Sequence, residues 1–317
     1  MAQRKIGKRK RRGTGGKPDR AGSSLAKRAR QRVSHGTLKA AKASLARARD
    51  LGDGARKVLH PEIHSPHISL LQAPLEAPPI RKVGDVFRVA SYNVHRWAGL
   101  NGRGKPNIQR AGAVIAALDA DVIALQEALR PTGEEDSLEG LAQDLGLHLA
   151  FAATRIHKRG ELGNAILSRY PITAISVLDL LSSRIESRCA LAASFDIGSG
   201  TLGVVATHLS LVDRTRHRQV EMLLRHPQWN AGPAVLLGDM NAWRECKASQ
   251  NLEDTLHRHS NVDWPATFPA SRPIFALDRI YASGAAVISM NAHDTHDARR
   301  ASDHLPVVAQ LSLSVPE

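Results

Sequence analysis

The stretch Ala234-Val-Leu-Leu-Gly-Asp-Met-Asn-Ala-Trp243 joins an apolar run to a polar ending. Residues 234–237 are continuously apolar, which predicts a strand buried on both faces. Gly238 allows the chain to turn tightly there, or another group to come close. If the chain stays extended, Asp239 and Asn241 point to the same side, because side chains alternate along a strand. This pair is either an Asx-rich turn or a carboxylate and an amide placed for chemistry.

The excess of positive charge lies in the first quarter of the chain. The formal net charge of the 317 residues is +14. Residues 1–80 hold 19 Lys+Arg and 5 Asp+Glu, whereas residues 81–317 hold 25 of each class. A basic character that could attract nucleic acid therefore belongs to the N-terminal segment, and the remainder is neutral overall.

The N-terminal segment has the composition of a tail. Residues 1–22 are charge-dense and poor in large apolar groups, which indicates disorder. The basic block 8–12 could bind nucleic acid or an anionic membrane, or could be a solvated or targeting tail or an over-extended start. Residues 23–59 favour a solvated basic helix, and the proline-containing residues 61–80 favour an extended linker. We therefore expect a tail and linker over 1–80 and a folded domain over 81–317.

Composition also limits compartment and class. The two cysteines, Cys189 and Cys246, cannot build a disulfide framework or a cysteine-based zinc site. No apolar run approaches the length of a membrane span, and the basic N-terminus lacks the apolar core of a signal peptide. We expect a cytoplasmic, monomeric protein without a transmembrane segment.

Strand and helix patterns mix from residue 81 onward. Strand patterns cover residues 86–94, 121–125, 165–167, 172–180, 189–197, 202–207, 234–237, 274–282 and 307–313, and helix patterns cover 108–118, 138–145 and 214–225. Strands that follow one another directly predominate. This order predicts an α/β protein of the α+β type, with two packed mixed sheets and helices outside them.

Polar residues recur where these strands end. They are Asn93, Glu127, His208, Asp239 with Asn241, Asp278, and Asp303-His304 ahead of the last strand. Each alone could satisfy a neighbouring backbone or cap a helix, but strand ends in layered folds meet at one rim. Carboxylates with neutral amide oxygens suit Mg²⁺ or Mn²⁺, whereas zinc favours clustered histidine or cysteine. Histidines beside such a site suggest proton transfer or stabilisation of a phosphoryl transition state.

With these residues in view, the chain resembles the endonuclease/exonuclease/phosphatase superfamily of magnesium-dependent phosphoesterases. The resemblance covers roughly residues 85–314, through the motifs SYNVHR, LQEA, GNAILSR, ATHLS, GDMNAW, LDRIYA and SDHLPV in order. It implies a four-layer sandwich of two mixed sheets flanked by helices. It also implies hydrolysis of a phosphoester by a metal- and Asp239-activated water.

The resemblance also implies a role for each motif residue. Glu127 would be the principal metal ligand, with Asn93 beside metal and phosphate and Asp303 as a second metal-side carboxylate. Asp239 would orient or deprotonate water, and His304, oriented by Asp278, would bind the scissile phosphate. His208 would bind phosphate or protonate the leaving group. Asn241 and Asn164 would contact the phosphate oxygens.

One position departs from the abasic-site endonucleases of this superfamily. They carry an acidic residue two positions after the first asparagine, where this chain has His95. The pattern is more similar to that of small bacterial hydrolases of the superfamily. His95 could contact phosphate, metal or leaving group, or could be a paired histidine that supports Asp303.

Substrate choice is less visible in the sequence. Possible phosphate clamps are 157–159, 214–218 and 299–300, and Trp97 and Trp243 could stack on a base or line an acyl cleft; solvated loops and core tryptophans are the structural alternatives. A phosphodiesterase acting on nucleic acid is the first hypothesis. The alternatives are a phosphoesterase for lipid head groups or small phosphoesters, with the tail on an anionic membrane, and a non-catalytic nucleic-acid-binding protein.

Overall fold

The structure is a computed structural model that describes residues 65–76, 86–131, 137–180, 186–198, 200–256 and 262–313. The chain divides into two units, Met1–Pro61 and Glu62–Glu317. The predictions of a disordered tail and of a basic helix fall on residues outside the described part. Among the described residues, no helix is long and apolar enough to cross a membrane.

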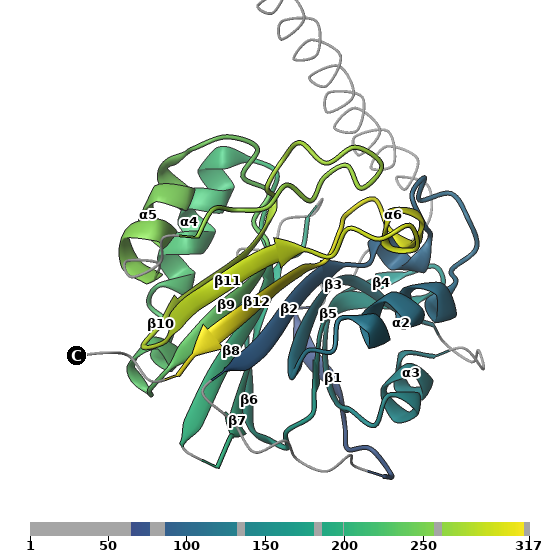
Figure 1. The fold of residues 1–317 in the computed structure, drawn as a ribbon, viewed down its shortest axis with the longest axis horizontal. Helices are drawn as coiled ribbons and strands as arrows, with labels where there is room; N and C mark the ends of the chain where they lie inside the picture. Colours follow the sequence, from purple (N-terminus) through teal and green to yellow (C-terminus); the bar gives the residue numbers. More distant parts are fainter. Residues whose placement is uncertain are drawn as a thin grey trace, which may run out of the picture. The chain divides into compact units, whose positions relative to one another are not determined.

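A seven-stranded mixed sheet forms one half of the domain (Figure 1). Its strand order is β1-β4-β5-β3-β2-β12-β11, in which β2 and β3 are parallel and the other neighbours antiparallel. The bounds are β1 His67–Gln72, β2 Phe87–Asn93, β3 Val122–Pro131, β4 His148–His157, β5 Gly160–Ser168, β11 Ala286–Ala292 and β12 Val307–Ser312.

A five-stranded sheet packs against it, with the order β10-β9-β8-β7-β6. The parallel pair here is β8 and β9. The bounds are β6 Ile172–Asp179, β7 Cys189–Asp196, β8 Thr201–His208, β9 Ala234–Asp239 and β10 Asp278–Ser283. Every residue of β9 is buried, as the apolar run from Ala234 predicts.

Three apolar cores hold four layers together. The core between the sheets contains Val89, Ile166, Val204 and Leu237. A second core lies under α2 (Ile108–Ala117), α3 (Leu138–Asp144) and α6 (Ala298–Ala301), and a third lies under α4 (Asp213–Leu223) and α5 (Lys247–Leu256). Figure 1 shows the two helix groups on opposite outer faces. The predicted four-layer sandwich of two mixed sheets is confirmed.

Two expectations about the chain's course are wrong. Residues 67–72, expected in an extended linker, form edge strand β1, paired with β4. The strand expected to end at residue 125 continues as β3 to Pro131 through a bulge between Leu125 and Ala128. A bulge leaves residues unpaired without ending the hydrogen-bonded ladder. The polar residues Gln126 and Glu127 in this bulge therefore look like the end of the strand in the sequence.

Candidate active site

The ends of several strands meet at one rim of the sandwich. The parallel pairs β2–β3 and β8–β9 each bring their carboxyl ends to the same side of a sheet. Asn93, His208 and Asp239 are the last residues of β2, β8 and β9. Asp278, the first residue of antiparallel β10, lies directly opposite Asp239. This topology explains why polar residues as far apart in the sequence as Asn93 and Asp278 meet at one rim.

Gly238 allows the approach of β8 and β9 at this rim. Its φ is +159°, and a Cβ atom there would lie 2.0 Å from the carbonyl oxygen of Thr207. A side chain at this position would therefore overlap the neighbouring backbone. The glycine of the GDMN motif is required by space, one residue before the carboxylate.

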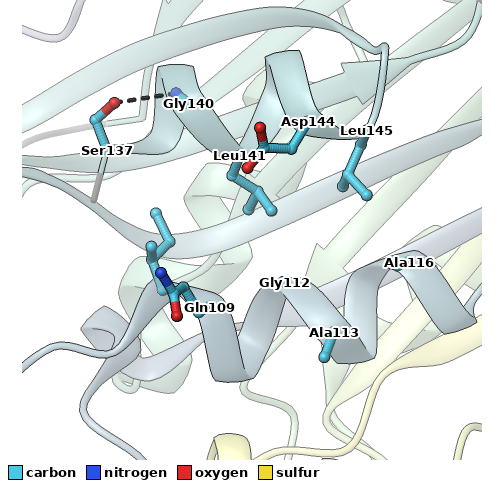
Figure 2. A pocket seen from close by; sticks show the side chains of 10 residues that line it. Gln109, Gly112, Ala113, Ala116, Ser137, Gly140, Leu141, Asp144 and Leu145 are labelled. Carbon is cyan, nitrogen blue, oxygen red and sulfur yellow. Dashed lines mark hydrogen bonds between the residues drawn. The ribbon is translucent and has the colours of Figure 1, made fainter. Parts of the chain in front are cut away.

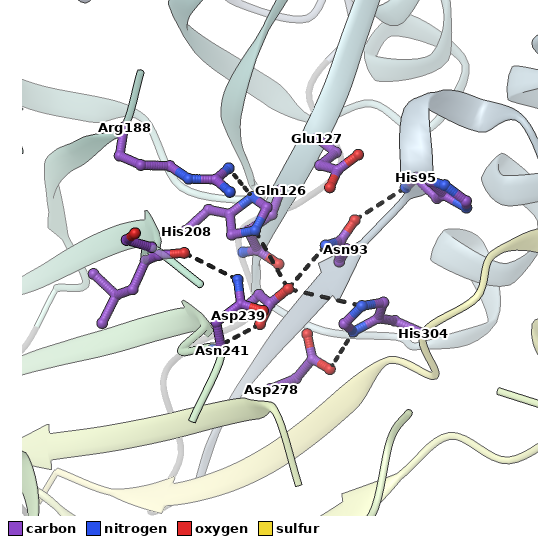
Figure 3. A network of polar contacts seen from close by, with 12 residues as sticks. Asn93, His95, Gln126, Glu127, Arg188, His208, Asp239, Asn241, Asp278 and His304 are labelled. Atoms are coloured by element: carbon purple, nitrogen blue, oxygen red, sulfur yellow. Dashed lines mark hydrogen bonds and ion pairs between the residues drawn. The ribbon is translucent and has the colours of Figure 1, made fainter. Parts of the chain in front are cut away.

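Asp239 is the centre of the polar network (Figure 3). The Nδ2 amide of Asn93 donates to its Oδ2 at 3.0 Å, and the Nε2 atoms of His208 and His304 lie 3.4 and 3.7 Å from the same oxygen. Its Oδ1 accepts the backbone N–H of Asn241 at 2.9 Å. Burial raises the pKa of Asp239 above its ordinary range, while His304 acts in the opposite direction. Asp239 is therefore a carboxylate that its hydrogen bonds hold in a fixed orientation and whose affinity for a proton is raised.

His304 is fixed from behind by a carboxylate. Its Nδ1 lies 2.8 Å from Oδ2 of Asp278, and the same oxygen accepts the hydroxyl of Thr267 at 2.6 Å. Burial opposes a charge on the ring, but Asp278 and Asp239 outweigh it and raise the pKa of His304 well above its ordinary value. His304 therefore presents a cationic Nε2–H toward Asp239.

His208 has the opposite kind of partner. Its Nδ1 lies 2.8 Å from Nη1 of Arg188, a residue in the segment before β7. Burial, and then the charge of Arg188, lower the pKa of His208 well below its ordinary value. Two imidazoles therefore face one carboxylate oxygen in different charge states.

Glu127 lies in the bulge of β3 with a left-handed backbone, φ +50°. Its Oε2 is 3.6 Å from Nε of Arg96. Burial tends to raise the pKa of Glu127, but the positive charges near it, those of Arg96 and Arg188 among them, outweigh burial and lower the pKa to about 2. Arg155 of β4 acts electrostatically on Glu127, Arg96 and Arg188. Glu127 is thus an ionised carboxylate within a group of arginines.

His95 and Asp303 form a separate pair. Nδ1 of His95 lies 3.1 Å from Oδ1 of Asp303 and 3.1 Å from the carbonyl oxygen of Gly99. A Cβ added at Gly102 would lie 2.6 Å from Nε2 of this ring, so the glycine packs against its other edge. His95 is therefore paired with Asp303, which is one of the two alternatives that the sequence analysis gave for this histidine. A contact between His95 and phosphate stays a prediction.

Asn164 is buried. It lies opposite the bulge of β3, because its neighbours Ala165 and Gly163 pair with Leu125 and Ala128. Its Nδ2 donates to the carbonyl oxygen of Cys189 at 3.0 Å. This bond links β5 to β7, so the side chain helps to hold the two sheets together. Its predicted contact with phosphate stays a prediction.

The rim contains a group of donors that could hold a metal ion. Among the described residues, atoms of Asp239, Asp278 and His304 lie within 4.8 Å of one another. The buried Oδ1 of Asp278 has no hydrogen-bond partner there. Glu127 and Asp303 add carboxylates with side chains 26% and 25% exposed, which leaves them open to a ligand.

Several predicted substrate contacts have structural roles instead. Arg216 is buried and bonds to Ser210 and Asp213, so it cannot serve as a phosphate clamp. Arg299 is paired with Asp294 at 2.5 Å. Trp97 is a core residue whose indole N–H donates to the carbonyl of Leu129.

Trp243 is half-buried and meets Phe268 and Phe275 edge-on. Phe268 lies 4.8 Å from the His304 ring, centroid to centroid. The aromatic group therefore borders the site, with Trp243 one ring removed from His304.

The sequence patterns did not identify the residues that orient the rim side chains: Thr267, Ser302, Arg188 and Glu186. Ser302, which donates to the carbonyl of Asn93 at 2.7 Å, lies within the SDH motif and could have been found there. Arg188 adjoins a strand start rather than a strand end, and Thr267 precedes no recognisable pattern.

An open groove of about 290 Å³ lies elsewhere, between α2 and α3 (Figure 2). Its lining includes Gln109, Gly112, Leu141 and Asp144. None of the predicted site residues lines it. The polar rim, rather than this groove, is therefore the candidate active site.

Two packed mixed sheets, with carboxylates, amides and two histidines at one rim, define the class of the phosphoester hydrolases with this four-layer fold. Residues 91–304 match the Endonuclease/Exonuclease/phosphatase family, and the chain belongs to this family. Its members are hydrolases that act on phosphoester bonds and generally depend on a divalent metal.

Several individual proteins are similar to this chain. The uncharacterized protein YbhP of Escherichia coli (strain K12) is 28% identical over 251 residues, which cover 72% of this chain and 96% of YbhP. An endonuclease/exonuclease/phosphatase from Beutenbergia cavernae has 25% identity and a TM-score of 0.60, with 73% of this chain and 72% of that chain covered. TDP2 of D. rerio, in a complex with a single-strand DNA product, shares the fold at 15% identity and a TM-score of 0.53, over 72% and 99% of the chains.

Proposed function

We propose that this protein is a divalent-metal-dependent phosphodiesterase, with nucleic acid as its substrate class. The observation that carries the proposal is the environment of Asp239 Oδ2. Asn93 Nδ2, His208 Nε2 and His304 Nε2 all lie within 3.7 Å of this one buried oxygen. A carboxylate placed among fixed hydrogen-bond donors is well suited to orient a water molecule for attack on a phosphoester.

Asp239 and His304 have different roles because they differ in charge. Asp239 accepts the proton of the attacking water, and its raised pKa increases its affinity for that proton. His304, held cationic by Asp278, donates to a phosphoryl oxygen as negative charge develops there. Asn241 orients Asp239 through its backbone N–H and uses its own amide on the carbonyl of Leu209. Its direct contact with phosphate stays a prediction.

The oxygen donors at the rim fit Mg²⁺ or Mn²⁺. Glu127, Asp303 and Asn93 are the residues we propose to hold the ion, because hard cations prefer such oxygens and few carboxylates. Asp278 and His304 suit it less, because they already bond to each other at 2.8 Å. When bound, the ion supplies positive charge that offsets the charge on the phosphoryl oxygens.

Nucleic acid is favoured by the positive charge around the rim. Arg96 and Arg188 both interact electrostatically with Glu127 and with Arg155 of β4. The half-buried rings of Phe268 and Trp243 lie on the side of His304. Guanidinium groups and exposed rings are what phosphates and bases contact. TDP2 of D. rerio, which shares the fold, is in a complex with a single-strand DNA product, and this supports the proposal.

A phosphoesterase for small phosphoesters or lipid head groups is the second candidate. It is favoured by the charge of residues 81–317, in which 25 basic and 25 acidic residues balance. A neutral surface gives little affinity for a long polyanion. The basic tail would then hold the enzyme on anionic membranes.

The deciding experiment offers the full-length protein single-stranded DNA, RNA, phospholipid vesicles and bis-p-nitrophenyl phosphate, each with Mg²⁺, Mn²⁺ or EDTA. We expect metal-dependent cleavage of nucleic acid and of the model diester, and a loss of at least about 10³-fold in kcat for Asp239→Asn. Asp294→Asn is the matched control, because this carboxylate pairs with Arg299 on an exposed loop. Activity that persists in EDTA, or in Asp239→Asn, would overturn the proposal, and cleavage of vesicles alone would establish the second candidate.

A further inference from the structure

The two histidines beside Asp239 differ in what holds them from behind. Their Nε2 atoms are at similar distances from Oδ2 of Asp239, 3.4 Å for His208 and 3.7 Å for His304. Behind His304 lies a carboxylate, that of Asp278, at 2.8 Å from Nδ1. Behind His208 lies a guanidinium, that of Arg188, at the same distance of 2.8 Å from Nδ1 (Figure 3).

This difference decides which ring nitrogen carries a proton. A guanidinium has only N–H donors and cannot accept a hydrogen bond. Nδ1 of His208 must therefore be the acceptor in the 2.8 Å contact with Arg188, which leaves the proton on Nε2. A carboxylate has only acceptors when ionised, so the same reasoning places a proton on Nδ1 of His304.

Arg188 is itself held in place by Glu186. One carboxylate oxygen of Glu186 accepts both Nε and Nη2 of Arg188, at 3.2 and 2.8 Å. The other accepts the hydroxyl of Ser210 at 2.5 Å, and the Ser210 backbone N–H donates to Gln219 of α4 at 2.8 Å. A chain of hydrogen bonds from Gln219 of α4 through Ser210 and Glu186 thus fixes the guanidinium of Arg188. Its remaining nitrogen, Nη1, points at His208.

We propose that Arg188 is a positioning residue that holds His208 as a neutral imidazole with its proton on Nε2. The inference rests on the proposed phosphoester hydrolysis and concerns the same site. A neutral imidazole releases its N–H proton far too reluctantly to protonate a leaving group near neutral pH. His208 instead donates a hydrogen bond to a phosphoryl oxygen, in the manner of an oxyanion-hole donor. Of the two roles expected for this histidine, phosphate binding remains and leaving-group protonation is removed.

The position of the ring proton can be measured without any activity. The full-length protein, labelled with ¹⁵N-histidine and kept in EDTA, should show His208 with a protonated Nε2 and an unprotonated Nδ1 at neutral pH. His304, whose Nδ1 faces the Asp278 carboxylate, should carry a proton on Nδ1, and His208→Gln identifies the signals of His208 by their loss. A proton on Nδ1 of His208, alone or together with Nε2, would overturn the inference even if the phosphodiesterase activity is confirmed.

Kinetics with a series of aryl phosphodiesters then separate the two roles of His208. The phenols in the series differ in acidity, so a lost general acid would cost most with the most basic leaving group. We expect His208→Ala to lower kcat/KM by about 10²- to 10³-fold, by the same factor for every leaving group. His208→Gln should recover most of this, because its amide donates a hydrogen bond but releases no proton. Losses that grow with leaving-group basicity would contradict the inference.

Variants of Arg188 test the positioning role directly. Arg188→Met, which keeps the length but donates nothing, should lower kcat by about tenfold and allow the proton to move to Nδ1 of His208. Arg188→Lys, which can only donate, should keep the wild-type ¹⁵N pattern and most of the activity. His226→Gln, at a histidine near Ser176 and Gln228, is the matched control. An unchanged ¹⁵N pattern in a folded Arg188→Met protein would overturn the role of Arg188.

Discussion

A single carboxylate oxygen, Oδ2 of Asp239, is the place where the chemistry of this molecule is concentrated. It faces one imidazole fixed by a carboxylate and another fixed by a guanidinium. A pair of like groups with opposite neighbours is a common way to obtain two charge states at one pH. The specificity of each role therefore lies in the residues behind the histidines, not in the histidines themselves.

The pair Asp278–His304 makes stability depend on pH. Because the pKa of His304 is raised well above its ordinary value of 6.5, the folded protein binds this proton more tightly than the unfolded chain. The stabilisation is complete below pH ~6.5 and is lost as the pH rises through the folded-state pKa of His304. Asp239, whose pKa is also raised, acts in the same direction.

We therefore expect the free energy of unfolding, measured by urea denaturation in EDTA, to fall as the pH rises above neutral. Asp278→Asn should be less stable at pH ~6 and should lose much of this slope, because its amide no longer favours the charged ring. A wild-type slope in Asp278→Asn, or stability that rises with pH in this range, would contradict the assignment of a cationic His304.

The residues at the rim were largely predictable, and those that support them were not. Asn93, His208, Asp239, Asp278 and His304 each follow or precede an apolar run, so a strand pattern with a polar end identified them. Arg188 and Thr267 act through contacts made across the fold. No spacing along the chain reports such contacts, because they depend on how loops approach the rim.

At the scale of elements, local conformations determine where the side chains point. Glu127 and Asn241 have left-handed backbones, with φ of +50° and +49°. Such conformations cost roughly 1 kcal/mol or more for a residue with a side chain. Alternation along a strand would have placed Asp239 and Asn241 on the same side, but the left-handed turn at Asn241 breaks this rule. The Asn241 side-chain amide donates to the carbonyl oxygen of Leu209, and its backbone N–H donates to Oδ1 of Asp239.

Gly238→Ala should destabilise the protein by roughly 3 kcal/mol or more, because the new Cβ would lie 2.0 Å from the carbonyl oxygen of Thr207, a backbone atom that cannot move alone. The midpoint and slope of urea denaturation give this value. Gly198→Ala is the control for backbone strain without overlap, since Gly198 has φ +80° and no atom of the described residues within 4 Å of its Cβ position.

Gly198→Ala should cost only about 1 kcal/mol, the usual penalty for an alanine in this conformation. If both variants lose the same stability, strain alone explains the glycine, and the tight approach of β8 and β9 is not what the GDMN motif requires.

The elements that sequence patterns missed share a physical cause. β4 is rich in alanine and buried along most of its length, and β11 is short and half-buried. Neither has the alternation of a half-buried strand or the long branched run of a core strand. α5 lacked a strong signal because only two of its ten residues, Leu252 and Leu256, are large and apolar. The layered architecture was still predictable, because the order of the clearer strands is enough to exclude a doubly wound sheet.

On the scale of the whole molecule, the structure moves the start of the folded domain ahead of residue 81. β1 pairs with the edge of the seven-stranded sheet, and Ser69 donates to Glu161 at 2.9 Å. The chain after β1 is fastened to Gln143 of α3, which accepts the N–H of Leu75 at 2.8 Å and donates to the carbonyl of Ala73 at 3.1 Å. Residues 67–75 therefore contribute contacts to the domain that a linker would not make.

Two truncated proteins separate the tail from this strand. The fragment 65–317 keeps β1 and should unfold at the same urea concentration as the full chain. The fragment 81–317 exposes the edge of β4 and should be less stable by about 2 to 4 kcal/mol, the sum of a few ladder hydrogen bonds at roughly 0.5 to 1.5 kcal/mol each. Equal stability of the two fragments would show that β1 is dispensable to the fold.

The same fragments test whether the basic segment binds nucleic acid, because residues 1–80 carry the whole net charge of +14. We expect the full chain to bind a fluorescent single-stranded DNA with an affinity that falls steeply with salt, since each neutralised phosphate of a single strand contributes a slope of about −0.7 to log K against log salt. The fragment 65–317 should bind more weakly and with a slope near zero. Cleavage of bis-p-nitrophenyl phosphate should be equal in both, because the rim is complete without the tail. If the fragment keeps the steep slope, the affinity comes from the arginines around Glu127 instead.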